Sequence, residues 1–154
     1  QNAVSATPLQ MALMAAAVAN GGVIMKPHVM SEVRDSEGAL VRKYQPAVWR
    51  RAMAADVAGT VRDLMVQVVQ RGTATALAVP NVPTAGKTGT AQIGNGKSHA
   101  WIVGFAPADA PKVAVAVIVE SQSGASEGTG GRVAAPIGRA VLEAALAVVP
   151  ETAP

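Results

Sequence analysis

Thr84-Ala85-Gly86-Lys87-Thr88-Gly89-Thr90-Ala91-Gln92 is the stretch that decides how the rest of this sequence is arranged. It places a lysine, two threonine hydroxyls and a glycine in consecutive positions. On an extended backbone successive side chains point to opposite faces, so Thr88 and Thr90 share one face, with Gly89 between them. Open backbone N–H groups beside a fixed positive charge suit a ligand with a carboxylate and a carbonyl that becomes an oxyanion. The alternative is a turn-flanked strand entry, and the stretch alone leaves both open.

The triplet Gly86-Lys87-Thr88 also resembles the end of a phosphate-binding loop. That motif requires a glycine five positions before the Gly-Lys pair, and a helix after it. Asn81 occupies the earlier position here, and Pro80 and Pro83 interrupt the approach. The Thr- and Gly-rich residues that follow favour a strand over a helix. We therefore exclude phosphate binding at this stretch.

Composition limits the remaining possibilities. The 154 residues fit one domain or a large piece of one, and half of them are hydrophobic, mostly Ala and Val. A net charge of only +3, without a basic run, argues against a nucleic-acid partner. The absence of cysteine excludes thiolate chemistry, and His28 and His99 cannot form a zinc site by themselves. We expect neither a metal nor a cofactor.

The sequence shows no membrane-spanning or targeting segment. Charges or glycines interrupt each apolar run well before the 18 residues that indicate a transmembrane helix. The chain starts at Gln1, without an initiator Met or a signal-peptide pattern. We interpret it as a processed or partial chain, with any membrane anchor outside it.

The first half of the sequence predicts two helices, over residues 1–20 and 53–71. Thr7 is a suitable N-cap and Pro8 a suitable first-turn residue, and glycines follow both helices. The predicted apolar faces comprise Leu9, Met11, Leu13, Met14, Ala16, Ala17 and Val18 in the first helix, and Met53, Val57, Val61, Leu64, Met65 and Val68 in the second.

Between these helices, residues 23–44 predict two extended runs around a turn at 35–38. We interpret His28 in this segment as a surface or packing residue. Residues 73–83 are predicted to form a loop.

The second half predicts an antiparallel meander of three strands, the first of them containing Lys87 to Gln92. The second and third strands are expected over residues 101–106 and 112–120, with a loop at 93–99 and a turn at 107–111. A loop at 121–131 and a helix over 131–149 follow, with Val133, Ile137, Val141, Leu142, Ala145 and Leu146 on the sheet. The loops are too short to mark a domain boundary. The expected fold class is therefore α+β, an antiparallel sheet flanked by helices in one folding piece.

The 121–131 loop contains Gly124-Ala125-Ser126-Glu127-Gly128, which formally matches a hydrolase nucleophile elbow. That elbow requires an acid and then a histidine downstream, and no histidine follows Ser126. We discount the match.

Three motifs in a fixed order point to one family. They are Val4-Ser5-Ala6-Thr7-Pro8-Leu9-Gln10-Met11-Ala12 leading to Ala19-Asn20-Gly21-Gly22, then Ala85 to Gln92, then His99-Ala100-Trp101-Ile102-Val103-Gly104-Phe105-Ala106-Pro107. At these spacings the chain resembles the C-terminal part of a transpeptidase domain of the class B penicillin-binding proteins, of the penicillin-binding protein A type. The resemblance covers nearly all of residues 1–154. It implies the penicillin-binding/serine β-lactamase-like fold, a five-stranded antiparallel sheet covered by helices.

The resemblance also implies acyl transfer by an activated serine. In this family the serine of a Ser-x-x-Lys motif attacks the carbonyl between two terminal D-alanines of a peptidoglycan stem peptide. β-Lactam antibiotics mimic that donor and stop at the acyl-enzyme. The implied location is the extracytoplasmic face of the cell membrane, with an N-terminal anchoring helix that is not in this chain. Cell-division proteins are possible partners.

The sequence departs from the family pattern at the nucleophile. No serine has a lysine three residues on, which excludes Ser5, Ser31, Ser36, Ser98, Ser121, Ser123 and Ser126. The Ser-x-Asn motif is absent too. We expect both motifs in an upstream half of the same domain, so this chain alone should be inactive.

By position, the family's roles fall on residues 87–90. Lys87 would supply positive charge beside the serine and the substrate carboxylate, which the Thr88 and Thr90 hydroxyls would bind. The Thr90 backbone N–H would be one oxyanion donor, and Gly89 would let the acyl group lie close to the strand.

Gln92, His99 and Trp101 are interpreted as structural, with the alternative that His99 and Trp101 border the cleft. Two other functions stay open: a serine β-lactamase or β-lactam sensor of the same fold, and a non-catalytic scaffold of a divisome-like assembly.

Overall fold

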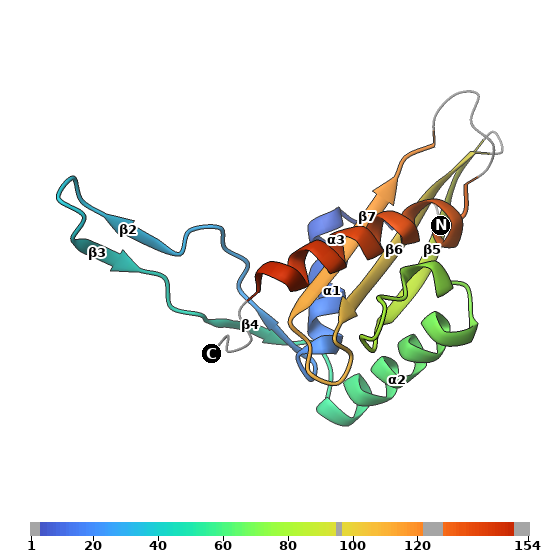
Figure 1. The fold of residues 1–154 in the computed structure, drawn as a ribbon, viewed down its shortest axis with the longest axis horizontal. Coiled ribbons are helices and arrows are strands. Elements are labelled where there is room, and N and C mark those ends of the chain that lie inside the picture. Colours follow the sequence, from blue (N-terminus) through green and yellow to red (C-terminus); the bar gives the residue numbers. More distant parts are fainter. Residues whose placement is uncertain (1–3, 95–96, 122–127, 150–154) are drawn as a thin grey trace.

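A three-stranded antiparallel sheet contains the Lys87 stretch and organises the fold. Its strands are β5 (Ala85–Gly94), β6 (Lys97–Ala106) and β7 (Val113–Val119), in the order β5-β6-β7. The structure is a computed structural model that describes residues 4–94, 97–121 and 128–149 (Figure 1). The predicted meander and the α+β class are confirmed. Of the five strands implied for the family, this sheet has three within the described residues.

The hairpin between β5 and β6 is longer than predicted. Residues 93–99 were expected to form a loop, but β5 continues to Gly94 and β6 starts at Lys97. The pairs Gln92↔Ser98 and Gly94↔Lys97 extend the ladder, with an irregularity between Gln92 and Gly94. Because backbone pairing needs no apolar side chain, this polar segment gave no strand signal.

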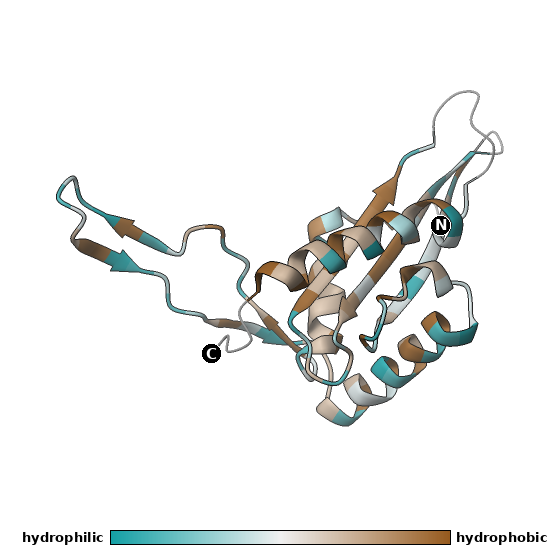
Figure 2. Ribbon diagram, in the orientation of Figure 1, coloured by the Kyte–Doolittle hydropathy of each residue, from teal (hydrophilic) through white to brown (hydrophobic). Residues whose placement is uncertain are grey.

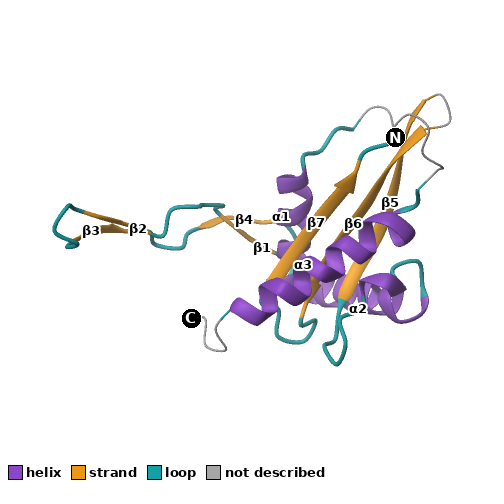
Figure 3. Ribbon diagram, turned by 45° about the horizontal axis from the view of Figure 1, so that its top comes forward, coloured by secondary structure: helices purple, strands orange, loops and turns teal. Residues whose placement is uncertain are grey.

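Two apolar clusters lie on opposite faces of the sheet. Alternate residues of β6 point to each, so that Ile102 belongs to one cluster and Phe105 to the other. The Ile102 cluster is covered by α3 (Ala135–Val148), and the Phe105 cluster by α1 (Pro8–Ala19) and α2 (Ala55–Arg71), whose Val69 also belongs to the Ile102 cluster. Figure 3 shows α1 and α3 on either side of the sheet.

The first helix begins at Pro8 rather than Gln1, and residues 1–3 lie outside the described residues. A capping box fixes this start. The Thr7 hydroxyl accepts the Gln10 N–H at 3.2 Å, and the Gln10 amide oxygen accepts the Thr7 N–H at 2.8 Å. Thr7 and Pro8 therefore carry the structural roles predicted for them.

The buried faces of the helices are narrower than the predicted stripes. Leu9, Val57, Ile137 and Val141 were expected on apolar faces but are 45–58% exposed. The buried helix positions include many small residues, namely Ala15, Ala17, Ala58, Ala135 and Gly138, and the larger buried residues are Val18, Met65, Val69 and Leu142. Small side chains let each helix approach the sheet closely, so larger residues at the flanks stay outside.

One short helical segment was not predicted, and the predicted helix over residues 131–149 begins with a different helical geometry from the rest. The 73–83 loop contains η1 (Thr75–Leu77), whose Leu77 is fully buried against the sheet. A π-helical turn, η2 (Gly130–Ala134), precedes α3.

A β-arm of residues 23–51 projects away from this body (Figure 1). β1 (Val23–Met25) pairs with β4 (Val48–Arg51) at its root, and β2 (Glu32–Arg34) pairs with β3 (Leu40–Lys43) towards its tip. The predicted turn is confirmed: the Asp35 carboxylate accepts the Glu37 and Ala39 N–H groups, both at 2.9 Å. Apolar and polar residues alternate along the arm in Figure 2 without a buried layer.

His28 lies on this arm and is exposed, and its ring stacks on Tyr44 with the ring centroids 3.5 Å apart. The interpretation as a surface packing residue is confirmed. No helix in the described part of the chain is long and apolar enough to cross a membrane.

Candidate functional site

The chemistry-bearing strip, Lys87 to Thr90, lies on the outer strand of the sheet. Within the described residues β5 pairs only with β6, so its other edge is free. Lys87 and Thr90 are exposed, and Thr88 and Gly89 are half-buried. The strip is therefore extended and accessible, as predicted.

The lysine and the threonines leave the strand through opposite faces. Lys87 pairs with Val103 and Gly89 with Trp101, so these four residues share one face. Thr88 pairs with Ile102 on the other face, and Thr90 is on the same side as Thr88. The predicted shared face of the two hydroxyls is confirmed. A ligand can reach both the lysine and the hydroxyls only along the free edge of the strand.

The Lys87 side chain folds back along its own strand. Its Nζ donates to the Thr88 carbonyl oxygen at 2.8 Å. In an antiparallel ladder alternate residues turn their backbone groups towards the partner strand and away from it. Because Lys87 reaches the Thr88 carbonyl, the backbone groups of Thr88 point to the free edge of β5. Those of Thr90, two residues later, point the same way.

Sequence reasoning missed one residue beside the strip. The Thr73 hydroxyl lies 2.6 Å from the Thr88 hydroxyl, although the two residues are 15 positions apart. Thr73 was predicted only as the start of a loop. No local pattern signals this contact, because the tertiary structure brings the two segments together.

An apolar groove of about 480 Å³ opens beside the strip. Residues of α1, α2, β5 and β6 line it, among them Met14 and Leu64 from the helices and Lys87 and Gly89 from the strand. Met14 is 46% exposed and Leu64 is 57% exposed. The groove therefore presents large apolar side chains next to the only lysine of β5.

A second cavity, of about 490 Å³, lies towards the end of the strip. His99, Trp101 and Gln92 line it together with residues 4–6. The Nδ1 atom of His99 accepts the Ser121 N–H at 3.2 Å, which fixes the ring. Trp101 lines both this cavity and the apolar groove. His99 and Trp101 thus border a cavity, the geometry required by the alternative left open for them.

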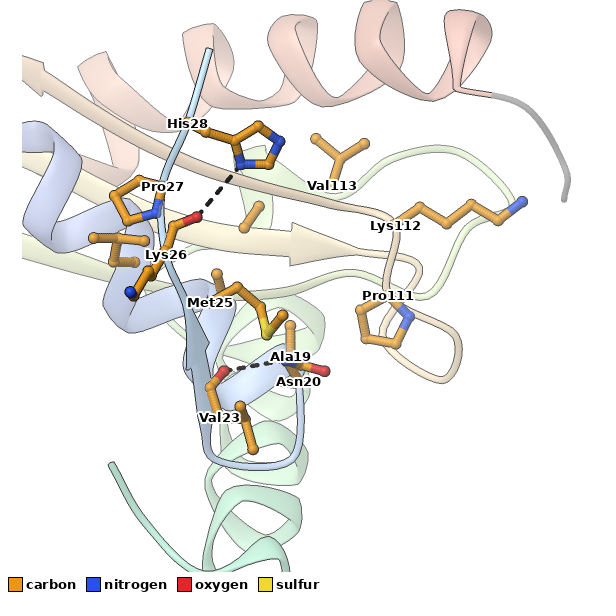
Figure 4. Close-up of a pocket in the computed structure, with 13 residues that line it drawn as sticks. Ala19, Asn20, Val23, Met25, Lys26, Pro27, His28, Pro111, Lys112 and Val113 are labelled. Carbon is orange, nitrogen blue, oxygen red and sulfur yellow. Dashed lines mark hydrogen bonds between the residues drawn. The ribbon is translucent and has the colours of Figure 1, made fainter. Parts of the chain in front are cut away.

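A third cavity, of about 500 Å³, lies at the root of the arm between α1 and the start of β7. His28, Lys26 and Lys112 lie around it, and Figure 4 shows His28 above the Met25 side chain. None of residues 87–90 lines this cavity. It is separate from the strip.

No group of three or more His, Cys, Asp or Glu side chains that could bind a metal occurs among the described residues. The discounted Gly124–Gly128 match lies almost wholly outside them, since residues 122–127 are not described.

Comparisons with known proteins fit this geometry. The sequence model of one protein family, the penicillin binding protein transpeptidase domain, matches residues 1–143. The peptidoglycan D,D-transpeptidase PbpA of Mycolicibacterium smegmatis is 44% identical in an alignment of 150 positions that covers 95% of this chain and 30% of that protein. The peptidoglycan D,D-transpeptidase MrdA of Acinetobacter baumannii is 35% identical in an alignment of 152 positions that covers 89% of this chain and 22% of that protein.

Solved structures agree. The imipenem acyl-enzyme complex of penicillin-binding protein A from Mycobacterium tuberculosis matches with a TM-score of 0.83 at 44% identity, over 95% of this chain and 32% of that one. The ceftriaxone acyl-enzyme complex of the same protein matches with a TM-score of 0.88 at 43% identity, over 95% of this chain and 34% of that one. This chain thus spans about a fifth to a third of the length of these relatives. It belongs to the penicillin-binding protein transpeptidase domain family.

Proposed function

We propose that this chain is the C-terminal portion of a transpeptidase domain in a serine D,D-transpeptidase that cross-links peptidoglycan stem peptides and is acylated by β-lactams. The observation that carries the proposal is the Lys87–Thr90 strip, extended on a free sheet edge beside an open groove. The family membership of the chain gives this strip its chemical meaning. The nucleophile belongs to a part of the protein outside residues 1–154.

In the proposed reaction a serine oxygen bonds to the carbonyl carbon between two terminal D-alanines. The C–N bond breaks, D-alanine leaves with a proton, and the amine of a second stem peptide later displaces the serine. The Thr90 N–H would stabilise the oxyanion that forms on the carbonyl oxygen. Gly89, which has no side chain, would let the acyl group approach the edge.

The carboxylate of the donor peptide is assigned to Lys87, Thr88 and Thr90. Lys87 supplies a positive charge, and both hydroxyls can donate to a carboxylate, which only accepts hydrogen bonds. Because Lys87 and the hydroxyls meet only at the strand edge, that edge is where the carboxylate would lie.

The groove supports an upstream partner within the same protein. Met14 and Leu64 are about half exposed in the groove that Lys87 also lines. A complete domain seldom exposes a large apolar surface to water unless that surface binds something. We assign the groove to the upstream half of the domain, which would carry Ser-x-x-Lys and Ser-x-Asn. The fraction of its relatives that this chain spans leaves ample length for such a half.

Peptidoglycan as substrate implies that the protein acts on the extracytoplasmic face of the membrane. We propose that an N-terminal helix outside this chain anchors it there, and that cell-division proteins are its partners.

The proposal is tested by labelling the full-length protein with a fluorescent penicillin. We expect a covalent band for the wild type and a rate of labelling about 100-fold lower for Lys87→Ala, the effect of losing one electrostatic stabiliser. Lys43→Ala, on the exposed arm, is the matched control and should label like the wild type. Absence of the band in the wild type would instead support the scaffold function.

The time course of the same band distinguishes a transpeptidase from a serine β-lactamase. A transpeptidase retains the label after free penicillin is removed. A serine β-lactamase would release it as hydrolysed penicillin, and that result would contradict the transpeptidase.

A further inference from the structure

Thr73 lies beside the strip but comes from a different element. It follows Gly72 directly after α2, and its Oγ1 atom is 2.6 Å from Oγ1 of Thr88. This distance is at the short end for a hydrogen bond between two hydroxyls. One of the two hydroxyls therefore donates a hydrogen bond to the other.

Backbone contacts from several elements fix the position of Thr73. The N–H groups of its neighbours Gly72 and Ala74 both donate to the Val68 carbonyl, at 3.0 and 3.2 Å, and Ala74 is fully buried. On the other side, Gly131 of η2 lies so close that a Cβ atom there would collide with the Thr73 carbonyl oxygen. Thr73 is thus held against Thr88 although its own side chain is exposed.

The chemistry of the pair depends on which hydroxyl donates. Each threonine hydroxyl has one hydrogen, and a carboxylate has none to offer. When Thr88 donates to a ligand carboxylate, it can bond Thr73 only as an acceptor. Thr73 must then donate to Thr88, and a chain of two aligned hydroxyls is stronger than one alone.

We propose that Thr73 is a positioning residue for carboxylate recognition, and that it orients the Thr88 hydroxyl towards the ligand. The inference rests on the proposed function, because it assigns the carboxylate to Thr88. It adds a residue from outside the strip that does not touch the ligand.

The test is the kinetics of acylation of the full-length protein by benzylpenicillin, resolved into a dissociation constant and a rate of acylation. Thr73→Val keeps the shape of the side chain and removes the hydroxyl. We expect it to raise the dissociation constant roughly three- to tenfold, the effect of one lost hydrogen bond, with little change in the acylation rate. Thr73→Ser keeps the hydroxyl and should restore wild-type affinity.

Two comparisons make the assignment specific. Thr60→Val removes a hydroxyl that donates to the Asp56 carbonyl at 3.1 Å within α2, and should leave both constants unchanged. Thr73→Val combined with Thr88→Val should bind no more weakly than Thr88→Val alone, because Thr73 acts through Thr88. Should Thr73→Val fail to fold, Thr73→Ala carries the same expectations.

The outcomes distinguish this inference from the function on which it rests. A wild type that benzylpenicillin does not acylate overturns both. A wild type that is acylated, with unchanged affinity in Thr73→Val, overturns only the role of Thr73. Strictly additive losses in the double variant, or a loss confined to the acylation rate, also overturn it.

Discussion

At the scale of single residues, two glycines in different surroundings give opposite expectations for the same change. A Cβ atom on Gly104 would lie 2.6 Å from the Ala85 carbonyl oxygen and 2.7 Å from Cδ2 of Leu77, whereas one on Gly59 of α2 would meet nothing within 4 Å. Gly104→Ala should lower the free energy of unfolding by about 1–3 kcal/mol through overpacking. Gly59→Ala should raise it by about 0.5–1 kcal/mol, because alanine favours the helix.

Urea unfolding of the full-length protein checks both glycine variants. Equal destabilisation by the two changes would contradict the close approach of β6 to β5 and η1 at Gly104.

Thr90 tests whether side chain and backbone act separately at one position. Thr90→Val removes the hydroxyl assigned to the carboxylate but leaves the N–H assigned to the oxyanion. We expect weaker binding of benzylpenicillin, by roughly three- to tenfold, and an acylation rate close to that of the wild type. Resolved acylation kinetics measure both constants. A lower acylation rate with unchanged affinity would contradict this division, because it would show that the hydroxyl acts in the chemical step and not on the carboxylate.

The sequence could predict the strip residues but not the pair that Thr73 completes. Alternation along one strand is enough to place Thr88 and Thr90 on the same face. The contact from Thr73 depends on where the end of α2 meets the sheet, and 15 intervening residues separate it from Thr88. Leu64 was assigned to a core stripe because its spacing is helical, yet it is 57% exposed and faces a groove.

At the scale of elements, the arm is separable from the site. Every residue between positions 27 and 46 is exposed, apart from the half-buried Tyr44, and none lines the groove beside Lys87. At the root of the arm Lys26 donates its N–H to the Ala47 carbonyl at 2.8 Å, so a two-residue Asn-Gly turn can connect these positions. We expect full-length protein with residues 27–46 replaced by this turn to fold and to be labelled by fluorescent penicillin at close to the original rate.

The labelling rate and the thermal midpoint of the shortened protein decide the point. Loss of labelling with an unchanged midpoint would show that the arm contributes to the site.

The contrast between buried, apolar strands of the sheet and exposed strands of the arm explains which strands could be predicted. β7 is rich in β-branched residues and β6 is largely apolar, so both have strong local signals. β4 was not predicted, because Val48–Arg51 is exposed and owes its conformation to pairing with β1, more than 20 residues earlier. The polar ends of β5 and β6 were missed for the same reason.

At the scale of the whole molecule, the groove should be an interior surface of the complete protein. Leu64 lines it and is 57% exposed in this chain, and Leu40 on the arm is 52% exposed. Leu64→Glu should lose about 3 kcal/mol or more in the full-length protein, because an unpaired carboxylate becomes buried. Leu40→Glu, matched in chemistry and exposure, should have little effect. Similar thermal midpoints for the two variants would show that the groove stays open to water.

The backbone contacts around the strip also affect the thermodynamics of binding. Gly104 lies directly against the main chain of β5, and Gly131 lies directly against the main chain of Thr73 beside Thr88, and main-chain atoms have no rotamers to rearrange. A wall built in this way has little conformational entropy left to lose when a ligand binds. Antibiotics of different shapes should therefore meet the same backbone surface along the strip, so the rigidity of each antibiotic should contribute to its affinity.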